Sequence, residues 1–314
     1  MKKKIILDCD PGHDDAVAIM LAAASDELEV LGITCVGGNT TLDNTIINTL
    51  KVCSLIQKEE IKIYAGCNKP LIYPLVTAEH VHGKSGLDTE GSSIKISSNY
   101  KTQKQHAVDF IIECCYSQNE KIYICPTGPL TNIASALKKD PSIKNNIQEI
   151  IFMGGVAMNL GNITPAAEFN IFVDPHAANI VLNSGITLIM MGLDVTHKVN
   201  VDDNIIDNIL SNKNKSSKFF AELMHFYSKF HRKLYNINSS PLHDPCVIAH
   251  LIDSSIFSGK LVNVTVEEKS NLTRGKTVVD WFGITGRNKN CTVMINADSD
   301  KFFKLLQERL SLLP

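Results

Sequence analysis

The sequence predicts an α/β fold: an open, mainly parallel, twisted sheet of the Rossmann type, with helices on both faces and an added C-terminal helical region. Short apolar runs alternate with segments of helical periodicity up to Val201, which is the pattern of a parallel sheet. Several of these runs end in Gly, Asp or Asn, the residues typical of loops at the edge of such a sheet. We find no repeat, no low-complexity tract and no linker, and we interpret residues 1–314 as one domain.

The predicted elements follow from local patterns. Each strand is a short apolar run, and each helix carries apolar residues three or four positions apart. Helical segments dominate after Val201, and two late apolar runs indicate antiparallel edge strands. The predicted strands are 4–7, 30–36, 61–64, 122–125, 150–153, 187–193, 261–266 and 276–281. The predicted helices are 14–25, 42–57, 105–117, 130–139, 175–184, 215–235, a segment that opens at 241–245, and 298–313, while residues 70–100 are expected to form a long loop.

Composition excludes several classes of function. The net charge is −2, so nothing favours binding to nucleic acid or to an anionic membrane surface. No apolar run approaches the roughly 18 residues of a membrane span, and the apolar run before Asp8 is too short for a signal peptide. The nine cysteines are an odd number without a Cys-x-x-Cys pair, which indicates reduced thiols and a cytoplasmic protein.

Residues 8–15, DCDPGHDD, place four carboxylates directly after the first predicted strand. Crowded like charges repel, and a bound cation that prefers oxygen ligands would compensate them. We therefore expect a divalent metal here, with one carboxylate left for catalysis. One alternative is a solvated turn in which Asp14 caps the next helix. Another is the Asp-x-Asp nucleophile of phosphoryl-transfer enzymes, which leaves Asp14 and Asp15 without a role. A helix–loop–helix calcium loop does not fit, because its required Gly and Glu are replaced by His13 and Ile19.

Polar or soft side chains also follow other predicted strands. Asn39 follows the second strand, Thr127 follows the fourth, and Met153 ends the fifth. Because the carboxyl ends of parallel strands meet at one edge of a sheet, we expect these residues to join the acidic stretch in a single site.

Three further motifs admit a functional and a structural interpretation. His243 and Asp244, in PLHDP, pair an imidazole suited to proton transfer with a metal ligand, or form a turn with a capping aspartate. The His-x-His motif that ends at His82 could bind zinc, although we favour a loop that closes over a substrate. Residues 161–170, GNITPAAEFN, could hold a polyol through Asn and Glu side chains or form ordinary Asx turns.

A group of ring-bearing residues late in the chain lies at helical spacing. Packing in the core or at an interface is the first interpretation of this face, and a wall for a flat ligand such as a nucleobase is the alternative. The residues are Phe226, Tyr227, Phe230, His231 and Tyr235.

These motifs, in this order, resemble the nucleoside hydrolases of the inosine–uridine-preferring type. The resemblance extends over nearly the whole chain. The segments that carry it are residues 8–15, 37–39, 82–83, 126–132, 153–155, 165–170 and 242–245.

The resemblance implies a role for each matching residue. The cofactor would be Ca²⁺, which would also hold a water and the 2′- and 3′-hydroxyls of ribose. Asp14 would take a proton from that water, His243 would assist the leaving base, and Asp8 would support the loop. The implied ligands of Ca²⁺ are Asp10, Asp15, Asp244 and the backbone carbonyl of Thr127. The implied contacts with the substrate are Asn39, His82, Met153, Asn162, Glu168 and Asn170, with Tyr227, His231 and Tyr235 toward the base.

The resemblance thus implies calcium-dependent hydrolysis of ribonucleosides to ribose and free base, in salvage. His231 departs from the tyrosine or glutamine expected in the helix that selects the base, and we infer a slight preference for pyrimidine nucleosides. A homotetramer is implied by the family alone. The alternatives are a metal-dependent phosphohydrolase with Asp8 or Asp10 as nucleophile, and a non-catalytic nucleoside-binding protein, against which the retained Asp14 argues.

Overall fold

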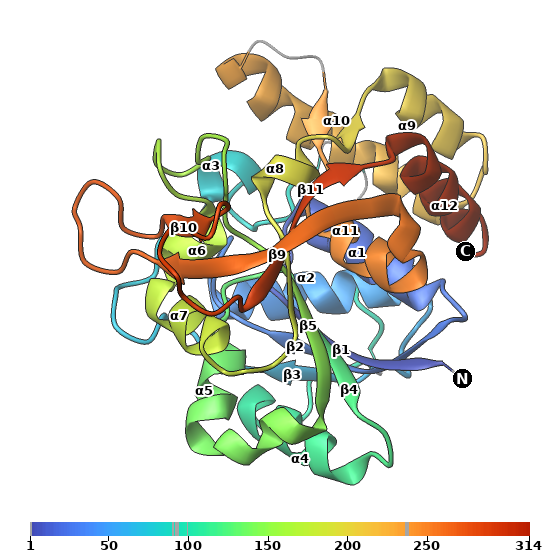
Figure 1. Cartoon of the computed structure of the whole chain (residues 1–314). Coiled ribbons are helices and arrows are strands. Elements are labelled where there is room, and N and C mark those ends of the chain that lie inside the picture. The colour runs from blue at the N-terminus through green and yellow to red at the C-terminus, as the bar shows by residue number, and fades with distance from the viewer. Residues whose placement is uncertain (1, 90, 92–93, 99, 236–238) are drawn as a thin grey trace.

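A computed structural model of the chain describes residues 2–89, 91, 94–98, 100–235 and 239–314, without the side chains of 231 and 233–235. Within these residues lies a nine-stranded sheet in the order β10-β9-β11-β6-β5-β4-β1-β2-β3 (Figure 1). Pairing is parallel from β3 to β11 and antiparallel among β11, β9 and β10. The strands are β1 (Lys3–Cys9), β2 (Leu28–Cys35), β3 (Ile63–Ala65), β4 (Ile122–Pro126), β5 (Ile147–Met153), β6 (Leu188–Met191), β9 (Phe257–Val266), β10 (Thr277–Asp280) and β11 (Cys291–Ala297).

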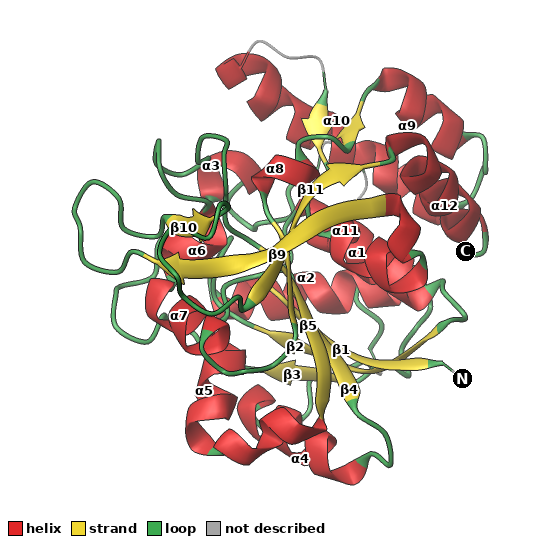
Figure 2. Ribbon diagram, in the orientation of Figure 1, coloured by secondary structure: helices red, strands yellow, loops and turns green. Residues whose placement is uncertain are grey.

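Helices cover both faces of this sheet, as Figure 2 shows. One face carries α1 (His13–Ala23), α2 (Leu42–Leu55), α9 (Asp203–Leu210), α10 (Lys215–Tyr235), α11 (Pro245–Ile252) and α12 (Ser299–Ser311). The other carries α4 (Ala107–Ser117), α5 (Thr131–Lys139) and α7 (Pro175–Leu182). The predicted fold class and the C-terminal helical region are confirmed.

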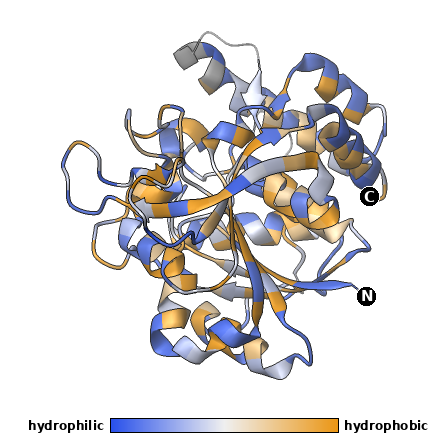
Figure 3. Ribbon diagram, in the orientation of Figure 1, coloured by the Kyte–Doolittle hydropathy of each residue, from blue (hydrophilic) through white to orange (hydrophobic). Residues whose placement is uncertain are grey.

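Each face of the sheet has its own apolar core. Ile5 and Leu7 pack into the core beneath α1, whereas Ile6 packs into the core beneath α5, because successive side chains of a strand point to opposite faces. A strand buried on both faces has a continuous apolar sequence, which is why residues 4–7 do not alternate. Hydrophobic residues gather along the sheet and hydrophilic ones on the outer helices (Figure 3).

Two predictions about the elements need correction. The strand predicted at 261–266 belongs to β9, which is not an edge strand because β10 pairs with its outer side. The unpredicted β11 lies between β9 and β6. Residues 70–100 also contain a short helix, α3 (Glu79–His82). The interpretation of residues 1–314 as one domain stays a prediction. The remaining elements are α6 (Phe169–Val173), α8 (Leu193–Thr196), the 3₁₀ helices Pro141–Asn146 and Ser254–Ile256, and a small ladder of β7 (Asn200–Val201) with β8 (Ser240–Pro241).

The order of the strands determines where the chain can hold a ligand. Strands β1 and β4 are neighbours, and the chain moves outward in opposite directions on either side of them. Such a switch point opens a crevice at the carboxyl ends of the strands. Asp8 pairs with Pro126 in register, so the acidic loop after β1 and Thr127 after β4 leave the sheet side by side. In the described part of the chain, no helix combines the length and apolarity needed to cross a membrane.

Candidate active site

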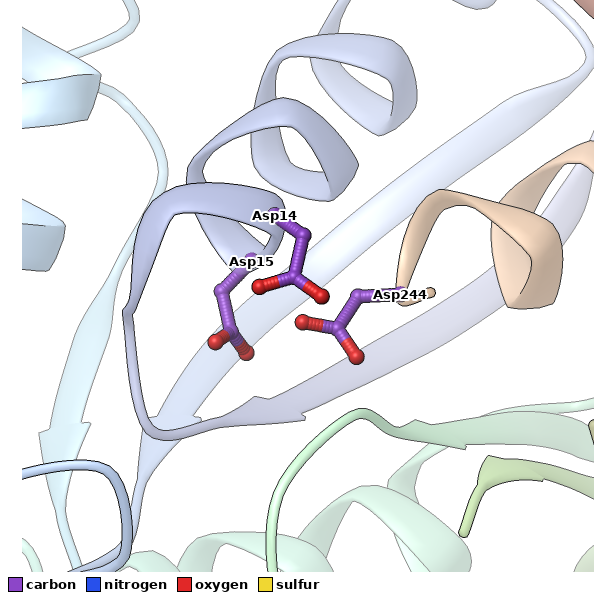
Figure 4. A group of neighbouring side chains, drawn as sticks. All are labelled: Asp14, Asp15 and Asp244. Carbon is purple, nitrogen blue, oxygen red and sulfur yellow. The ribbon is translucent and has the colours of Figure 1, made fainter. Parts of the chain in front are cut away.

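Three buried carboxylates meet at this crevice. Asp14 and Asp15 lie in the first turn of α1, and Asp244 directly precedes α11. One carboxylate oxygen from each residue lies within 4.8 Å of those of the other two (Figure 4). Residues separated by more than two hundred positions thus form one acidic cluster.

Asp15 is oriented by a set of hydrogen-bond donors. Its Oδ2 accepts the backbone N–H of Gly12 at 2.9 Å and the side-chain amide of Asn39 at 3.2 Å. Its Oδ1 accepts the hydroxyl of Thr127 at 2.7 Å. Three segments that follow three different strands therefore hold this one carboxylate.

Asp10 lies beside this cluster, and only one of its two carboxylate oxygens has a hydrogen-bond partner among the described residues. Its Oδ2 accepts the backbone N–H of Asn39 at 2.6 Å. Its Oδ1 is buried and has no hydrogen-bond partner among the described residues. A Cβ at Gly38 or Gly128 would overlap the carboxylate, so these two glycines leave the space that Asp10 occupies.

Burial raises the pKa of Asp10 and of the three carboxyl groups of the acidic cluster. The pKa of Asp14 rises to about 7 because of burial and the charge of Asp15. The pKa values of Asp10 and Asp244 rise well above their usual range because of burial and repulsion from neighbouring aspartates. A cation would remove both penalties, and the unpartnered Asp10 oxygen offers it a ligand. The donor set is all oxygen, which fits a hard divalent cation.

Asp8 lies apart from this group, within β1. It is fully buried and accepts hydrogen bonds from the hydroxyl of Thr34 and from the side-chain amide of Asn132 at 2.8 Å. Burial raises the pKa of Asp8 to about 7. Its contacts join β1, β2 and the start of α5, and its supporting role stays a prediction.

Polar residues around α6 form a second hydrogen-bonded group. Glu168 is the N-cap of α6: its Oε1 accepts the N–H of Asn170 at 2.9 Å, and its Oε2 accepts the N–H of Gly155 at 2.8 Å. The Asn170 amide donates to the carbonyls of Thr127 at 2.7 Å and Met153 at 3.2 Å. Glu168 and Asn170 therefore connect the loops after β4 and β5.

Asn162 precedes this group in the same loop. Its Oδ1 accepts the backbone N–H of Phe169 at 2.9 Å, which attaches the loop to the start of α6.

Two histidines contact buried partners through Nδ1. Nδ1 of His82 lies 2.9 Å from Nδ1 of His13, and the His82 ring stacks on Tyr227 at a centroid distance of 5.5 Å. Nδ1 of His243 lies 2.7 Å from Oγ1 of Thr196. Both histidines are more than nine-tenths buried, yet both line a cavity beside the acidic cluster.

A cavity of about 580 Å³ brings most of the predicted residues together. Asp10 and Asp15 do not line it, but they hydrogen-bond to Asn39, which does. The side chains of His231 and Tyr235 lie outside the described residues. The predicted residues that line the cavity are Asp14, Asn39, His82, Thr127, Met153, Asn162, Glu168, Asn170, Tyr227, His243 and Asp244.

Several lining residues were not predicted from the sequence. His197 and Asn200 come shortly after β6, so the rule that ligands bind at the carboxyl ends of strands could have indicated them. Phe230, by contrast, was named in the sequence as part of the aromatic face of α10, and its place in the lining supports the interpretation of that face as a wall for a flat ligand. The apolar members carry no chemical signal in the sequence; examples are Ala78, Val81, Leu160, Ile163 and Phe169.

Comparisons with known proteins identify the family of the chain. A family model described as inosine-uridine preferring nucleoside hydrolase matches residues 5–304. The pyrimidine-specific ribonucleoside hydrolase RihA of Salmonella schwarzengrund is 44% identical over 311 residues, which cover 99% of both chains. A plant nucleoside hydrolase structure aligns with a TM-score of 0.91 at 30% identity over 99% of both chains. The purine-preferring ribonucleoside hydrolase of Gardnerella vaginalis aligns with a TM-score of 0.91 at 33% identity over 98% of both chains. The chain therefore belongs to the inosine-uridine preferring nucleoside hydrolase family and is an enzyme of the ribonucleoside hydrolase class.

Proposed function

We propose that this enzyme is a calcium-dependent ribonucleoside N-ribohydrolase in which Asp14 is the general base and His243 assists the leaving base. The observation that carries this proposal is that both side chains border one cavity next to the acidic cluster. Hydrolysis of an N-glycosidic bond needs a nucleophile, stabilisation of positive charge on the sugar and a better leaving group.

The metal site of this proposal consists of Asp10, Asp15, Asp244 and the carbonyl of Thr127. Support comes from the unpartnered Oδ1 of Asp10 and from the mutual repulsion of the buried carboxylates. Oxygen-only ligands favour calcium over zinc. When bound, the cation would neutralise these carboxylates and attract a water and the hydroxyls of the sugar.

Asp14 suits the role of general base because it lines the cavity, whereas Asp15 is held by Gly12, Asn39 and Thr127. In the proposed step, a water oxygen attacks the anomeric carbon of ribose and Asp14 takes a proton from that water. The bond from the anomeric carbon to the base breaks, and its electron pair stays on the base. A carboxylate beside the attacking water can take its proton in the transition state, and a bound cation would favour the ionised form of Asp14 that this role needs.

His243 completes the reaction by donating a proton to the leaving base. A nucleobase anion is a poor leaving group, so protonation lowers the barrier to cleavage. His82, on the short helix α3, would contact the base.

Asn162, Glu168 and Asn170 would hold the ribose. Their existing hydrogen bonds keep each side chain in one orientation, which limits the entropy lost when substrate binds. Asn39 and Met153 complete the proposed ribose contacts.

The preference for pyrimidine nucleosides is the most specific part of the proposal. The relative named as pyrimidine-specific is 44% identical to this chain, whereas the structure named as purine-preferring is 33% identical. We propose that salvage of pyrimidine ribonucleosides is the role of this enzyme.

The described cysteines are free thiols, which supports a reducing cytoplasm as its location. We also propose that the enzyme is a homotetramer, and sedimentation analysis would test this oligomeric state.

One experiment tests the proposed function. A panel of ribonucleosides, with uridine, cytidine, inosine and adenosine as members, is assayed for release of reducing sugar with and without a chelator. We expect release that stops with chelator, resumes with Ca²⁺ and is faster for uridine than for inosine. Release of phosphate from phosphate esters, with no release of base, would instead support a phosphohydrolase. Neither candidate nucleophile of that alternative lines the cavity. Asp8 is buried against Thr34 and Asn132, and Asp10 is buried against Asn39.

A further inference from the structure

We propose that Thr196 is a positioning residue that sets the orientation of the His243 ring for proton transfer to the leaving base. The inference rests on the proposed role of His243 and extends it to a residue outside the cavity lining. Thr196 closes helix α8, whereas His243 lies between β8 and α11. Their side chains meet at 2.7 Å between Oγ1 and Nδ1, and both are buried.

The contact is held from the His243 side by backbone pairing. The N–H of Leu242 donates to the carbonyl of Val199 at 2.9 Å. Next to it, Val201 pairs with Ser240 in the β7–β8 ladder. The segments on which Thr196 and His243 lie are therefore joined side by side, and a rotation of the ring would have to break the contact between Oγ1 and Nδ1.

The contact is also held from the Thr196 side. The N–H of Thr196 donates to the carbonyl of Gly192 at 3.1 Å, and the N–H of Leu193 donates to the carbonyl of Gly155 at 2.9 Å. The Asp194 carboxylate accepts the N–H groups of Met158 at 2.9 Å and Asn159 at 3.0 Å. Helix α8 is thus attached to the loop after β5, which also borders the cavity.

A hydroxyl group suits this position for a chemical reason. It can donate to an unprotonated Nδ1 and accept from a protonated one, so the contact survives a proton transfer by the ring. Occupation of Nδ1 by Thr196 assigns the reaction with substrate to Nε2, the nitrogen that Thr196 does not contact. Partners of this kind orient histidines in metal sites, and their loss weakens function without removal of the reacting group.

The test compares Thr196→Val, which keeps the branched shape without the hydroxyl, with Thr196→Ser, which keeps the hydroxyl. Both are assayed on uridine and on p-nitrophenyl riboside, whose leaving group needs no proton. We expect Thr196→Val to lower kcat for uridine by roughly tenfold, which corresponds to one buried hydrogen bond, with KM little changed. The rate on p-nitrophenyl riboside should be retained, and Thr196→Ser should restore most of the lost uridine activity.

Controls separate positioning from general damage. Thr45→Val removes another buried hydroxyl, which donates to the carbonyl of Leu42 in α2, and should not distinguish the two substrates. In a His243→Ala background, Thr196→Val should cause no further selective loss. Two results in Thr196→Val would overturn the proposal for Thr196: full activity on uridine, or equal losses on both substrates. If His243→Ala still impairs uridine selectively, the acid role of His243 would stand in either case. Equal losses on both substrates in His243→Ala would overturn the acid role, and the inference about Thr196 with it.

Discussion

Nδ1 of His82 lies 2.9 Å from Nδ1 of His13, so a residue of the acidic stretch orients a residue of the substrate cavity. His13 Nε2 lies 2.8 Å from the backbone carbonyl of Asp88, which anchors the His13 ring. Burial lowers the pKa of His13 to about 4, so this ring is neutral. The backbone N–H of His13 donates to the same Nδ1 of His82 at 3.3 Å, so His13 holds this nitrogen through both its ring and its backbone.

Replacement of His13 tests this relationship. His13→Phe keeps a ring that can stack on Phe226 but removes both ring nitrogens. Without its partner, His82 loses its fixed orientation, so we expect kcat/KM for uridine to fall by roughly tenfold, mainly through KM. Steady-state kinetics measure the change. His106→Phe, at the distant N-cap of α4, is the control and should leave kcat/KM unchanged. If His13→Phe and the control behave alike, the pair has no role in binding.

Asp14→Asn tests the general base. The amide keeps the shape of the side chain but cannot take a proton, so we expect turnover of uridine to fall by about 10²–10⁴-fold. Calorimetry should still detect cation binding, because Asp10, Asp15 and Asp244 remain. Asp43→Asn, at an exposed position of α2, is the control and should be fully active. Loss of cation binding together with turnover would make Asp14 a metal ligand instead, since its carboxylate lies in the acidic cluster.

Gly38→Ala tests the space around Asp10. The new Cβ would overlap the Asp10 carboxylate, so we expect cation affinity and stability both to fall, with about 1–3 kcal/mol lost from the free energy of unfolding. Gly185→Ala is the control, because nothing lies within 4 Å of its Cβ although its φ is +81°. That variant should lose stability through backbone strain alone and keep its cation affinity. Normal affinity in Gly38→Ala would show that Asp10 does not contribute to cation binding.

The pH dependence of stability tests the cation site as a whole. Burial raises the pKa values of Asp8, Asp14 and Glu168 to about 7, from roughly 4 in an unfolded chain. Between about pH 4 and pH 7, the folded protein without metal therefore holds more protons than the unfolded chain. The contribution of these groups to the free energy of unfolding is therefore full below about pH 4 and is lost as the pH rises from there through about 7.

The measurement is the melting temperature from pH 5 to pH 8, in chelator and in excess Ca²⁺. We expect the melting temperature in chelator to fall with pH, and the gain from Ca²⁺ to be larger at pH 8, where the carboxylates are ionised. A melting temperature in chelator that rises over this range would contradict the raised pKa values. A gain that is equal at both pH values would exclude ionised carboxylates as the ligands.

Much of this architecture could be predicted from the sequence because its signals are local. A continuous apolar run such as residues 5–7 predicts a strand buried on both faces, and the four carboxylates of residues 8–15 predict a cation site. Strand β11, Cys291–Ala297, was missed although its Thr, Val and Ile residues favour a strand, because its continuous apolar run is only three residues long. Its place between β9 and β6 arises from pairing between distant segments.

The sequence by itself determined the alternation of strands and helices, the acidic stretch and the residue types available for catalysis. Only the tertiary structure decided that Thr196 contacts His243 and that His13 contacts His82. The physical reason is that a hydrogen bond depends on the distance and direction between two atoms. In this protein the order of the strands and the packing of α3, α8 and α10 set those distances, and residues that meet there are separated by tens of positions in the chain.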